Sequence, residues 1–246
     1  MKTLEQLYNW FFLGTTCANA KITNCNKLLR VAPIEKVHSY KDLAIEENNF
    51  AFAEKNGNWE IEYFHGLRNF LWIKKSDFPL IFIFDNHNHA PVFRYHSIKE
   101  LNVNSPTLIH IDQHSDCWKN EESLEIKNNE YDLENIFHFY NEKCNVGNFI
   151  LPSLNSWIIS DQIQIRSSTA LKNLEIEKNQ NYILDVDLDF CLNWVDRNTI
   201  NEESINLLKE KFNEVWKSVL CITIATSPYF LNQGIAINII EQLFDK

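Results

Sequence analysis

Short apolar runs recur along the chain, and each has the length of a buried strand. They are Leu80–Phe84, Thr107–Ile111, Ile163–Ile165, Tyr182–Leu188 and Val219–Ala225. Continuous apolar runs of this kind are typical of strands that are covered on both faces of a sheet. Nearer the N-terminus, residues alternate on both sides of Asn56-Gly57. The alternation predicts a hairpin over Phe50–Tyr63, with the Asn-Gly pair in a type I′ turn.

Apolar residues three and four positions apart predict the helices. Leu4, Leu7, Tyr8 and Phe11 predict an N-terminal helix. Three later helices are predicted from Leu133, Ile136, Phe137 and Tyr140, from Ile205, Leu208, Phe212, Val215, Trp216 and Val219, and from Ile235, Ile239, Ile240, Leu243 and Phe244. Thr199 and Glu202 have the spacing of a capping box, which predicts the start of the second of these three.

Strands that alternate with amphipathic helices predict an α/β fold. We expect a mainly parallel sheet between two helical layers, a three-layer α/β/α arrangement. The sequence has neither an internal repeat nor a Pro/Ser linker, so residues 1–246 are interpreted as a single domain. Ligands of such sheets bind at the carboxyl ends of the strands, where the chemistry should therefore be sought.

Composition narrows the function classes. The chain has 45% hydrophobic residues with 5 Gly and 6 Pro, which excludes a mainly disordered or collagen-like protein. A net charge of −10 argues against general nucleic-acid binding and suits metal cations or basic substrates, although it also serves plain solubility. The six Cys form no CxxC pair, so we expect reduced thiols in a cytoplasmic protein without a thiolate zinc ribbon. The apolar run at residues 10–13 is too short to span a membrane.

Three of the predicted strands end in polar clusters. Asp85-Asn86-His87-Asn88-His89 follows the first strand, Asp112-x-His114-x-Asp116 the second, and Asp185-x-Asp187-x-Asp189 lies at the end of the third. Residues two apart on extended backbone share a face, so the alternating side chains are expected to converge. His110 precedes Asp112 by two residues, so its side chain would share the same face at a deeper position. Because it lies within an apolar strand, it is interpreted as a core histidine.

Carboxylates gathered on one sheet repel each other unless cations lie between them. Carboxylate and imidazole ligands suit Mn²⁺, and Fe²⁺, Co²⁺ and Zn²⁺ also accept them. Each motif alone has a plainer interpretation. The Asp-x-His-x-Asp run could be a capped loop, and the triple-Asp run a calcium loop or a solvated turn. Their joint occurrence after apolar strands favours a site for two divalent ions about 3.5–4 Å apart.

The paired metal motifs resemble the binuclear manganese signature of the arginase–deacetylase fold. Across residues 80–230 the chain is similar to peptide arginases of ribosomal-peptide (RiPP) biosynthesis. The matching stretches are His87-Asn88-His89, Asp112–Asp116, Gly147-Asn148 and Thr223–Pro228. The resemblance implies that arginine residues of a precursor peptide are hydrolysed to ornithine with release of urea, and that two Mn²⁺ ions are the cofactor.

The resemblance also implies a set of ligands. One ion would be bound by His87, Asp112, Asp116 and Asp185, and the other by Asp112, His114, Asp185 and Asp187. The Gly-Gly-Asp-His stretch of arginases is absent here, so His89 is an alternative to His87. The arginase Asp-Val-Asp-Gly-Leu-Asp-Pro stretch is shortened, which leaves the role of Asp189 open.

Further roles follow for the reaction. Asp116 would orient the attacking hydroxide and take its proton, and His89 or His138 would protonate the leaving amine. Asp189 and Glu202 are candidates to bind the guanidinium, although Glu202 also fits a helix cap. Asn148 has two interpretations, as a substrate contact and as a turn residue after Gly147.

Two other kinds of function compete. One is a different hydrolase on the same fold, either a small-molecule ureohydrolase acting on arginine, agmatine or a guanidino acid, or an amide deacetylase. Deacetylases of this fold usually use one zinc and a Tyr, and no such Tyr stands out in the sequence. The other is a non-catalytic metal- or peptide-binding module. The metal content would distinguish a ureohydrolase from a deacetylase. The sequence does not predict the oligomeric state.

Overall fold

The computed structural model describes residues 2–13, 27–74, 79–124, 132–177, 180–193, 199–215 and 218–244. Among these residues a seven-stranded sheet has the order β3-β6-β7-β11-β10-β8-β9. Its strands are β3 (Ile34–Val37), β6 (Phe70–Ile73), β7 (Leu80–Phe84), β8 (Thr107–Ile111), β9 (Asp161–Ile165), β10 (Tyr182–Asp187) and β11 (Val219–Ala225). The five strands from β7 to β9 run parallel, whereas β6 is antiparallel to β7 and parallel to β3.

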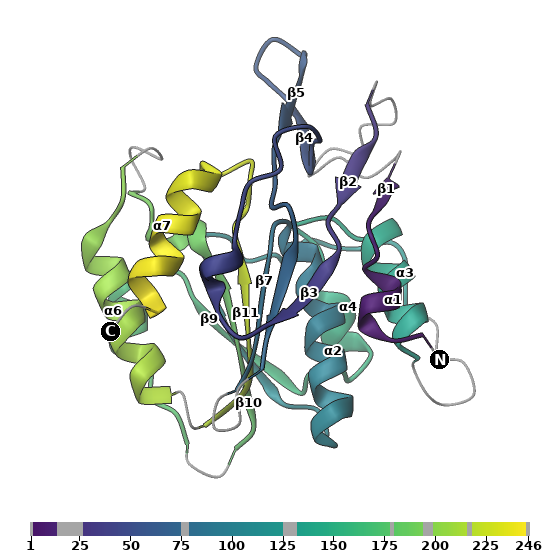
Figure 1. The fold of residues 1–246 in the computed structure, drawn as a ribbon. Coiled ribbons are helices and arrows are strands. Elements are labelled where there is room, and N and C mark those ends of the chain that lie inside the picture. The colour runs from purple at the N-terminus through teal and green to yellow at the C-terminus, as the bar shows by residue number, and fades with distance from the viewer. Residues whose placement is uncertain are drawn as a thin grey trace.

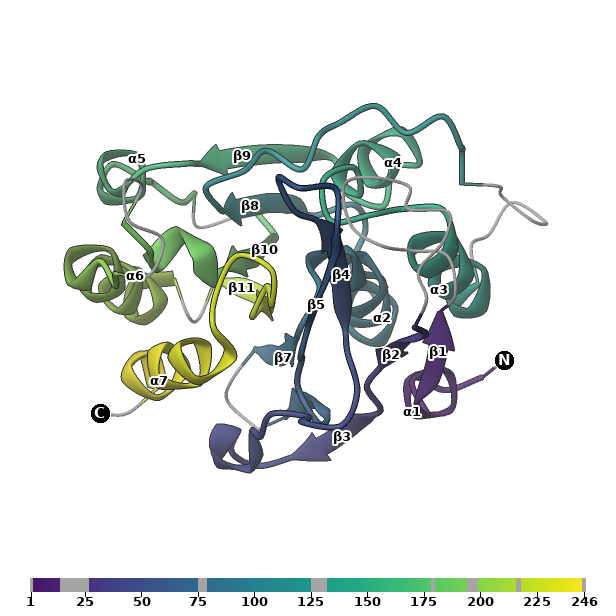
Figure 2. The ribbon, with the colours of Figure 1, turned by 90° about the horizontal axis from the view of Figure 1, so that it is seen from above.

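Helices cover both faces of this sheet (Figures 1 and 2). On one face lie α1 (Leu4–Leu7), α2 (Ala90–Leu101), α3 (Leu133–Glu142) and α4 (Ile150–Asn155). On the other lie α5 (Ser168–Lys172), α6 (Glu202–Val215) and α7 (Gln233–Phe244). A separate apolar core fills each interface between sheet and helices. The predicted α/β fold with a mainly parallel sheet and flanking helices is confirmed. None of the described helices is long and apolar enough to cross a bilayer.

The buried strands follow the apolar runs closely. β7, β8 and β11 have the predicted bounds to the residue. β9 starts two residues earlier than predicted, at Asp161, and β10 ends at Asp187. The first residues of β9 are polar, with Asp161 exposed and Gln162 half-buried, because this strand forms the edge of the sheet, so the apolar run marks only its inner part.

Helix α2 is absent from the sequence-based prediction. It begins at Ala90, directly after the short 3₁₀ turn η2 (His87–His89), and Pro91 lies in its first turn. Its residues are buried on nearly every side, including Val92, Phe93 and Arg94. A helix covered all round has no polar stripe, and therefore no 3.6-residue periodicity to reveal it.

The N-terminal helix is much shorter than predicted. Its apolar periodicity extends to Phe11, but α1 ends at Leu7, and Trp10 has a φ of 29°. That left-handed residue redirects the chain into β1 (Phe11–Leu13), which pairs antiparallel with β2 (Leu29–Val31). Phe11 therefore belongs to a strand, although its helical spacing suggested otherwise.

The predicted capping box at α6 is wrong. The helix begins at Glu202, whereas a box with Thr199 as its N-cap would begin it two residues earlier. Asn201 caps the helix instead, since its side-chain oxygen accepts a hydrogen bond from the backbone N–H of Ser204 (3.2 Å).

The predicted hairpin is confirmed, but its turn is different. β4 (Phe52–Lys55) and β5 (Ile61–Phe64) pair antiparallel. The backbone N–H of Asn56 donates to the carbonyl of Glu60 (2.9 Å), which closes a three-residue loop. A loop of this length places its left-handed residue third, and here that residue is Trp59, with a φ of 67°, not Gly57. The prediction of a type I′ turn is therefore wrong.

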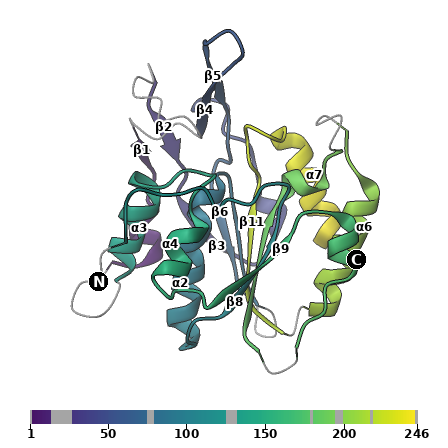
Figure 3. The ribbon, with the colours of Figure 1, turned by 180° about the vertical axis from the view of Figure 1, so that it is seen from behind.

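The two small sheets lie at one end of the molecule. Figures 1 and 3 show β1–β2 and β4–β5 side by side beyond the carboxyl ends of the parallel strands. They therefore adjoin the edge of the sheet at which ligands bind in folds of this kind.

Candidate metal centre

Acidic and imidazole side chains gather at the carboxyl ends of β7, β8 and β10. Their order in the sheet brings these ends to one edge. The buried members of this metal cluster, as we call it, are His87, His110, Asp112, Asp116, Asp185, Asp187 and Asp189. His114 completes the metal cluster, with its side chain 33% exposed.

His87 lies at the centre of the metal cluster. Its Nδ1 is 3.2 Å from Oδ2 of Asp112, 3.2 Å from Oδ2 of Asp116 and 3.3 Å from Oδ2 of Asp187. Burial alone would lower the pKa of this imidazole, but the surrounding carboxylates, Asp185 foremost, raise it well above its usual value. Three carboxylates around one ring nitrogen form a natural pocket for a cation.

A second group of donors forms around His114. Its Nδ1 is 2.9 Å from Oδ2 of Asp189 and 3.3 Å from Oδ1 of Asp112. Hydrogen bonds to these carboxylates raise the pKa of His114 to about 10. Burial, together with the nearby charges of Asp187 and Asp112, raises the pKa of Asp189 well above its usual value. Asp112 thus faces both histidines.

The donor atoms fit divalent cations. Several of them are buried without a well-aligned hydrogen bond, namely Nδ1 of His87, Nε2 of His110, Oδ2 of Asp112 and both carboxylate oxygens of Asp189. Buried polar atoms are rarely left so in proteins. Four overlapping triads have ligand atoms within 4.8 Å of one another, and Asp112 belongs to three of them. These residues could therefore hold a metal ion, and Asp112 belongs both to a donor group with His87 and to one with His114.

Asp185 lies deeper than the other carboxylates. It is in register with His110 of β8 and Thr223 of β11, inside the sheet. The Thr223 hydroxyl donates to Oδ1 (2.5 Å), while Nδ1 of His110 (2.9 Å), Nε2 of His87 (3.1 Å) and Nη1 of Arg94 (3.6 Å) surround Oδ2. Despite its burial, these neighbours hold the pKa of Asp185 well below its usual value. Both carboxylate oxygens of Asp185 thus have nearby donors, whereas neither carboxylate oxygen of Asp189 has a well-aligned hydrogen bond.

Three residues that contact the metal cluster are not predicted from the sequence pattern. Arg94, on α2, is buried beside Asp185, and its place directly after the apolar run Ala90–Phe93 is the signal that could have revealed it. Ser227 has a φ of 45°, and its hydroxyl donates to Oδ2 of Asp187 (2.6 Å). Thr223 and Ser227 belong to a stretch singled out only by resemblance. His110 is buried as predicted, but its partners are Asp185 and Asp112.

The structure brings His87, not His89, into the metal cluster. His89 packs against Phe70 and Phe84, and its Nδ1 is 3.2 Å from the hydroxyl of Tyr8. Burial lowers its pKa to about 3. A histidine that is neutral in this way holds no spare proton near neutral pH, so the structure gives no support to His89 as the general acid.

The other predicted contacts lie elsewhere. Asn148 closes a turn, where its Oδ1 accepts from the backbone N–H of Asn145 (2.8 Å). Glu202 is exposed in the first turn of α6. His138 is exposed on α3, with Nδ1 2.8 Å from a carboxylate oxygen of Glu142. None of the three side chains lines the described cavity over the metal cluster.

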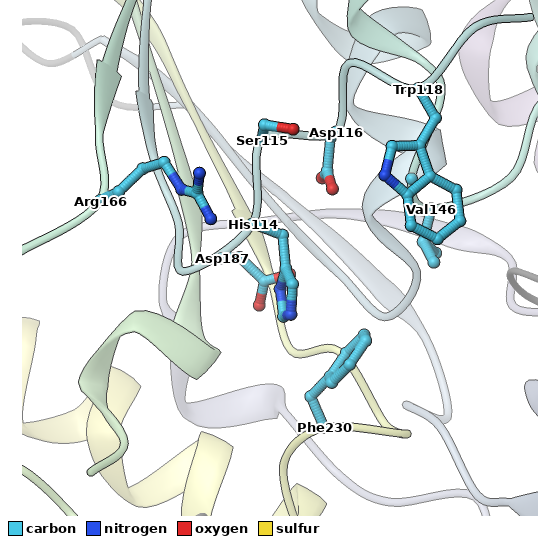
Figure 4. Close-up of a pocket in the computed structure, with 9 residues that line it drawn as sticks. His114, Ser115, Asp116, Trp118, Val146, Arg166, Asp187 and Phe230 are labelled. Atoms are coloured by element: carbon cyan, nitrogen blue, oxygen red, sulfur yellow. The ribbon is translucent and has the colours of Figure 1, made fainter. Parts of the chain in front are cut away.

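A cavity of about 140 Å³ opens over the metal cluster (Figure 4). His114, Asp116 and Asp187 line it together with Trp118, Arg166 and Phe230. Asp116 has a φ of 49°, a strained conformation typical of functional sites. Burial and the charge of Asp112 raise the pKa of Asp116 to about 7. The cavity therefore exposes one carboxyl that can exchange a proton near neutral pH.

No protein-family model matches the chain, and no curated protein matches it.

The burial of His89 predicts a pH effect on stability. Its pKa is about 3 in the folded chain and about 6.5 when unfolded, so the folded state loses stability as pH falls below 6.5. Between pH 7.5 and pH 5 we expect this group to cost about 2 kcal/mol. Urea unfolding of metal-free protein at both pH values should show that loss, and His89→Gln should lack it. Equal pH dependence of the two proteins would contradict the prediction.

Proposed function

We propose that the chain is a manganese-dependent peptide arginase, which hydrolyses arginine residues of a precursor peptide to ornithine and urea. The main support is Asp112, which belongs to one donor set with His87 and to another with His114. Two histidine–carboxylate sets that share a carboxylate suit a pair of metal ions in a hydrolase. Ligands of oxygen and imidazole nitrogen without thiolate favour Mn²⁺.

The distances favour a ligand set in which Asp187 and Asp189 take the places that the resemblance gives to Asp185 and Asp187. His87, Asp112, Asp116 and Asp187 would hold one ion, and Asp112, His114, Asp187 and Asp189 the other. Asp185 would orient His87 through Nε2, leaving Nδ1 for the metal. Asp189 is then a ligand and no longer a candidate to bind the guanidinium.

The cation pair would lower the pKa of water and polarise the guanidinium. Asp116 has the position for the proton transfer, because its carboxyl lines the cavity and lies beside His87 and Asp112 in the metal cluster. It takes the proton of the attacking water and returns it to the leaving amine nitrogen as the C–N bond breaks. Ser227 holds the Asp187 carboxylate in place beside it.

Arg166 supports a second candidate, a ureohydrolase acting on a small guanidino acid. Nε and Nη2 of Arg166 both donate to the carbonyl of Gln113 (3.1 and 2.8 Å), which fixes the guanidinium at the rim of the cavity. Figure 4 shows this side chain directed toward His114 and Asp187. A fixed cation there would pair with the carboxylate of free arginine or of a guanidino acid.

A urea and mass assay tests the proposal. Mn²⁺-loaded protein would be incubated with an arginine-containing peptide and, in parallel, with free arginine and agmatine. We expect urea and a mass loss of CH₂N₂ per arginine in the peptide, with little turnover of the free compounds. Turnover of free arginine alone would favour the ureohydrolase.

The control variant is Asp116→Asn. Its amide oxygen can still serve as a metal ligand, and the other proposed ligands are unchanged, so we expect the variant to bind metal. It should lose most activity because the carboxylate that accepts the proton is gone. Metal analysis should find about two Mn²⁺ per chain in the wild type. A single zinc would instead favour a deacetylase, and full activity of the metal-loaded variant would exclude the role given to Asp116.

A further inference from the structure

Gln113 joins two turns of the metal cluster through its side chain. It lies in the turn that follows β8, between two of the proposed metal ligands, and is 8% exposed. Its Nε2 donates to the carbonyl of Asp189 (2.8 Å) and to the carbonyl of Leu192 (3.1 Å). Asp189 belongs to the 3₁₀ turn η3 (Leu188–Cys191), which follows β10. One buried amide therefore bonds the turn after β8 to the turn after β10.

The backbone of the turn after β8 is bonded to the end of β9. Nε and Nη2 of Arg166 donate to the carbonyl of Gln113 (3.1 and 2.8 Å). Nε2 of Gln164 donates to the carbonyl of Ser115 (3.0 Å). Gln113 is thus held through its carbonyl and also through its side-chain amide. Because β9 is a strand of the main sheet, these bonds connect η3 to the sheet through Gln113.

The Asp189 carboxylate depends on the backbone of η3 for its position. Neither of its oxygens has a well-aligned hydrogen bond, although Nδ1 of His114 lies 2.9 Å from Oδ2. Asp187 differs, because the Ser227 hydroxyl donates to its Oδ2 (2.6 Å). Without an aligned bond to hold it, the Asp189 carboxylate is placed by its own backbone. The Gln113 amide holds that backbone at the Asp189 carbonyl.

The ligands proposed for the first ion are held independently of η3. Nε2 of His87 lies 3.1 Å from Oδ2 of Asp185. The carbonyl of Asp116 accepts a hydrogen bond from the backbone N–H of Ile150 (3.2 Å). Neither contact involves η3 or the Gln113 amide. Loss of that amide should therefore act on one ion and not on the other.

We propose that Gln113 is a positioning residue for the second metal ion, the one bound through His114 and Asp189. Its amide keeps η3 close enough to the turn after β8 for these two side chains to bind the same ion. The first ion, bound through His87 and Asp116, does not depend on this amide. The inference rests on the two-ion arrangement of the proposed function.

Mn²⁺ binding to Gln113→Met tests the inference. Met is similar in length to Gln but donates no hydrogen bond. Equilibrium dialysis of the full chain over a range of Mn²⁺ concentrations would give the ions bound per chain. We expect one ion to bind as in the wild type and the other about 10–100-fold more weakly, the usual effect of removing a group that orients a metal ligand. Gln113→Asn, whose amide is one methylene shorter, should show the same selective loss.

Gln180→Met is the matched control. The Gln180 amide also joins β8 to β10, but at the amino ends of these strands. Its Nε2 donates to the hydroxyl of Thr107 (2.6 Å), and its Oε1 accepts from the hydroxyl of Tyr182 (2.9 Å). This variant loses a comparable link far along the strands from the metal cluster, so it should bind both ions as the wild type does.

The pattern of loss decides the role of Gln113. Equal weakening of both ions in the Gln113 variants, or no weakening of either, would overturn it. A wild type that binds two ions but releases no urea from any arginine peptide would overturn the proposed reaction and leave the role of Gln113 in metal binding standing. A wild type that binds a single ion would overturn both.

Discussion

Replacing Asp112 by Asn should remove both metal ions together and reduce hydrolysis by several orders of magnitude. Oδ2 of Asp112 lies 3.2 Å from His87, and Oδ1 lies 3.3 Å from His114, so one carboxylate serves both donor sets. An amide has one oxygen acceptor and no charge, so it cannot bridge two cations in the same way. Metal content after dialysis, measured by elemental analysis, should fall from about two ions per chain to well below one.

A matched control separates this loss from a general charge effect. Asp161→Asn removes the same charge from the exposed start of β9, outside every candidate triad, and should leave metal content unchanged. The thermal unfolding midpoint should rise on adding Mn²⁺ to the wild type and to Asp161→Asn, but not to Asp112→Asn. An Asp112→Asn protein that retains two ions would refute the shared-ligand arrangement.

The carboxylates of β10 show how far alternation can predict a site. Their period of two correctly placed Asp185 and Asp187 on one face, because residues two apart on a strand share a face. It was wrong for Asp189, which lies in the 3₁₀ turn η3 (Leu188–Cys191) and meets His114 from there. The sequence could not tell which of them would lie at the edge of the sheet. That depends on the register with β8 and β11, which sets Asp185 opposite His110 and Thr223. Register is a tertiary property, and it determines which carboxylates remain free for metal.

The side chains of Asp112, His114 and Asp116 do converge, but not because residues two apart on extended backbone share a face. Strand β8 ends at Ile111, so these residues are not on extended backbone. They converge through a tight turn that ends in Asp116 with a φ of 49°. The side chains still meet at His87 and His114, and the turn that achieves this has no Gly or Pro to mark it in the sequence.

Arg94 provides the last large expected effect, on stability. Its guanidinium is 1% exposed, with Nη1 3.6 Å from Oδ2 of Asp185 and Cζ 5.5 Å from the ring centroid of Phe149. Arg94→Met preserves much of the apolar volume but removes the guanidinium beside the buried Asp185, whose remaining partners are Thr223 and the imidazoles of His87 and His110. Breaking a buried pair costs about 3–5 kcal/mol when the remaining charge is uncompensated, and these neighbours should keep the loss near the lower end of that range. Urea unfolding of metal-free protein should show that decrease in the free energy of unfolding.

Three further variants make the result specific to the Arg94–Asp185 pair. Arg68→Met, at an exposed position, should change the free energy of unfolding by less than about 0.5 kcal/mol. Arg94→Lys retains the charge and should lose less than Arg94→Met. Adding Asp185→Asn to Arg94→Met should recover part of the loss, because the uncompensated carboxylate disappears with its partner. Strictly additive losses in this double-mutant cycle would show that Arg94 stabilises the fold through its packing on Phe149 alone and not through Asp185.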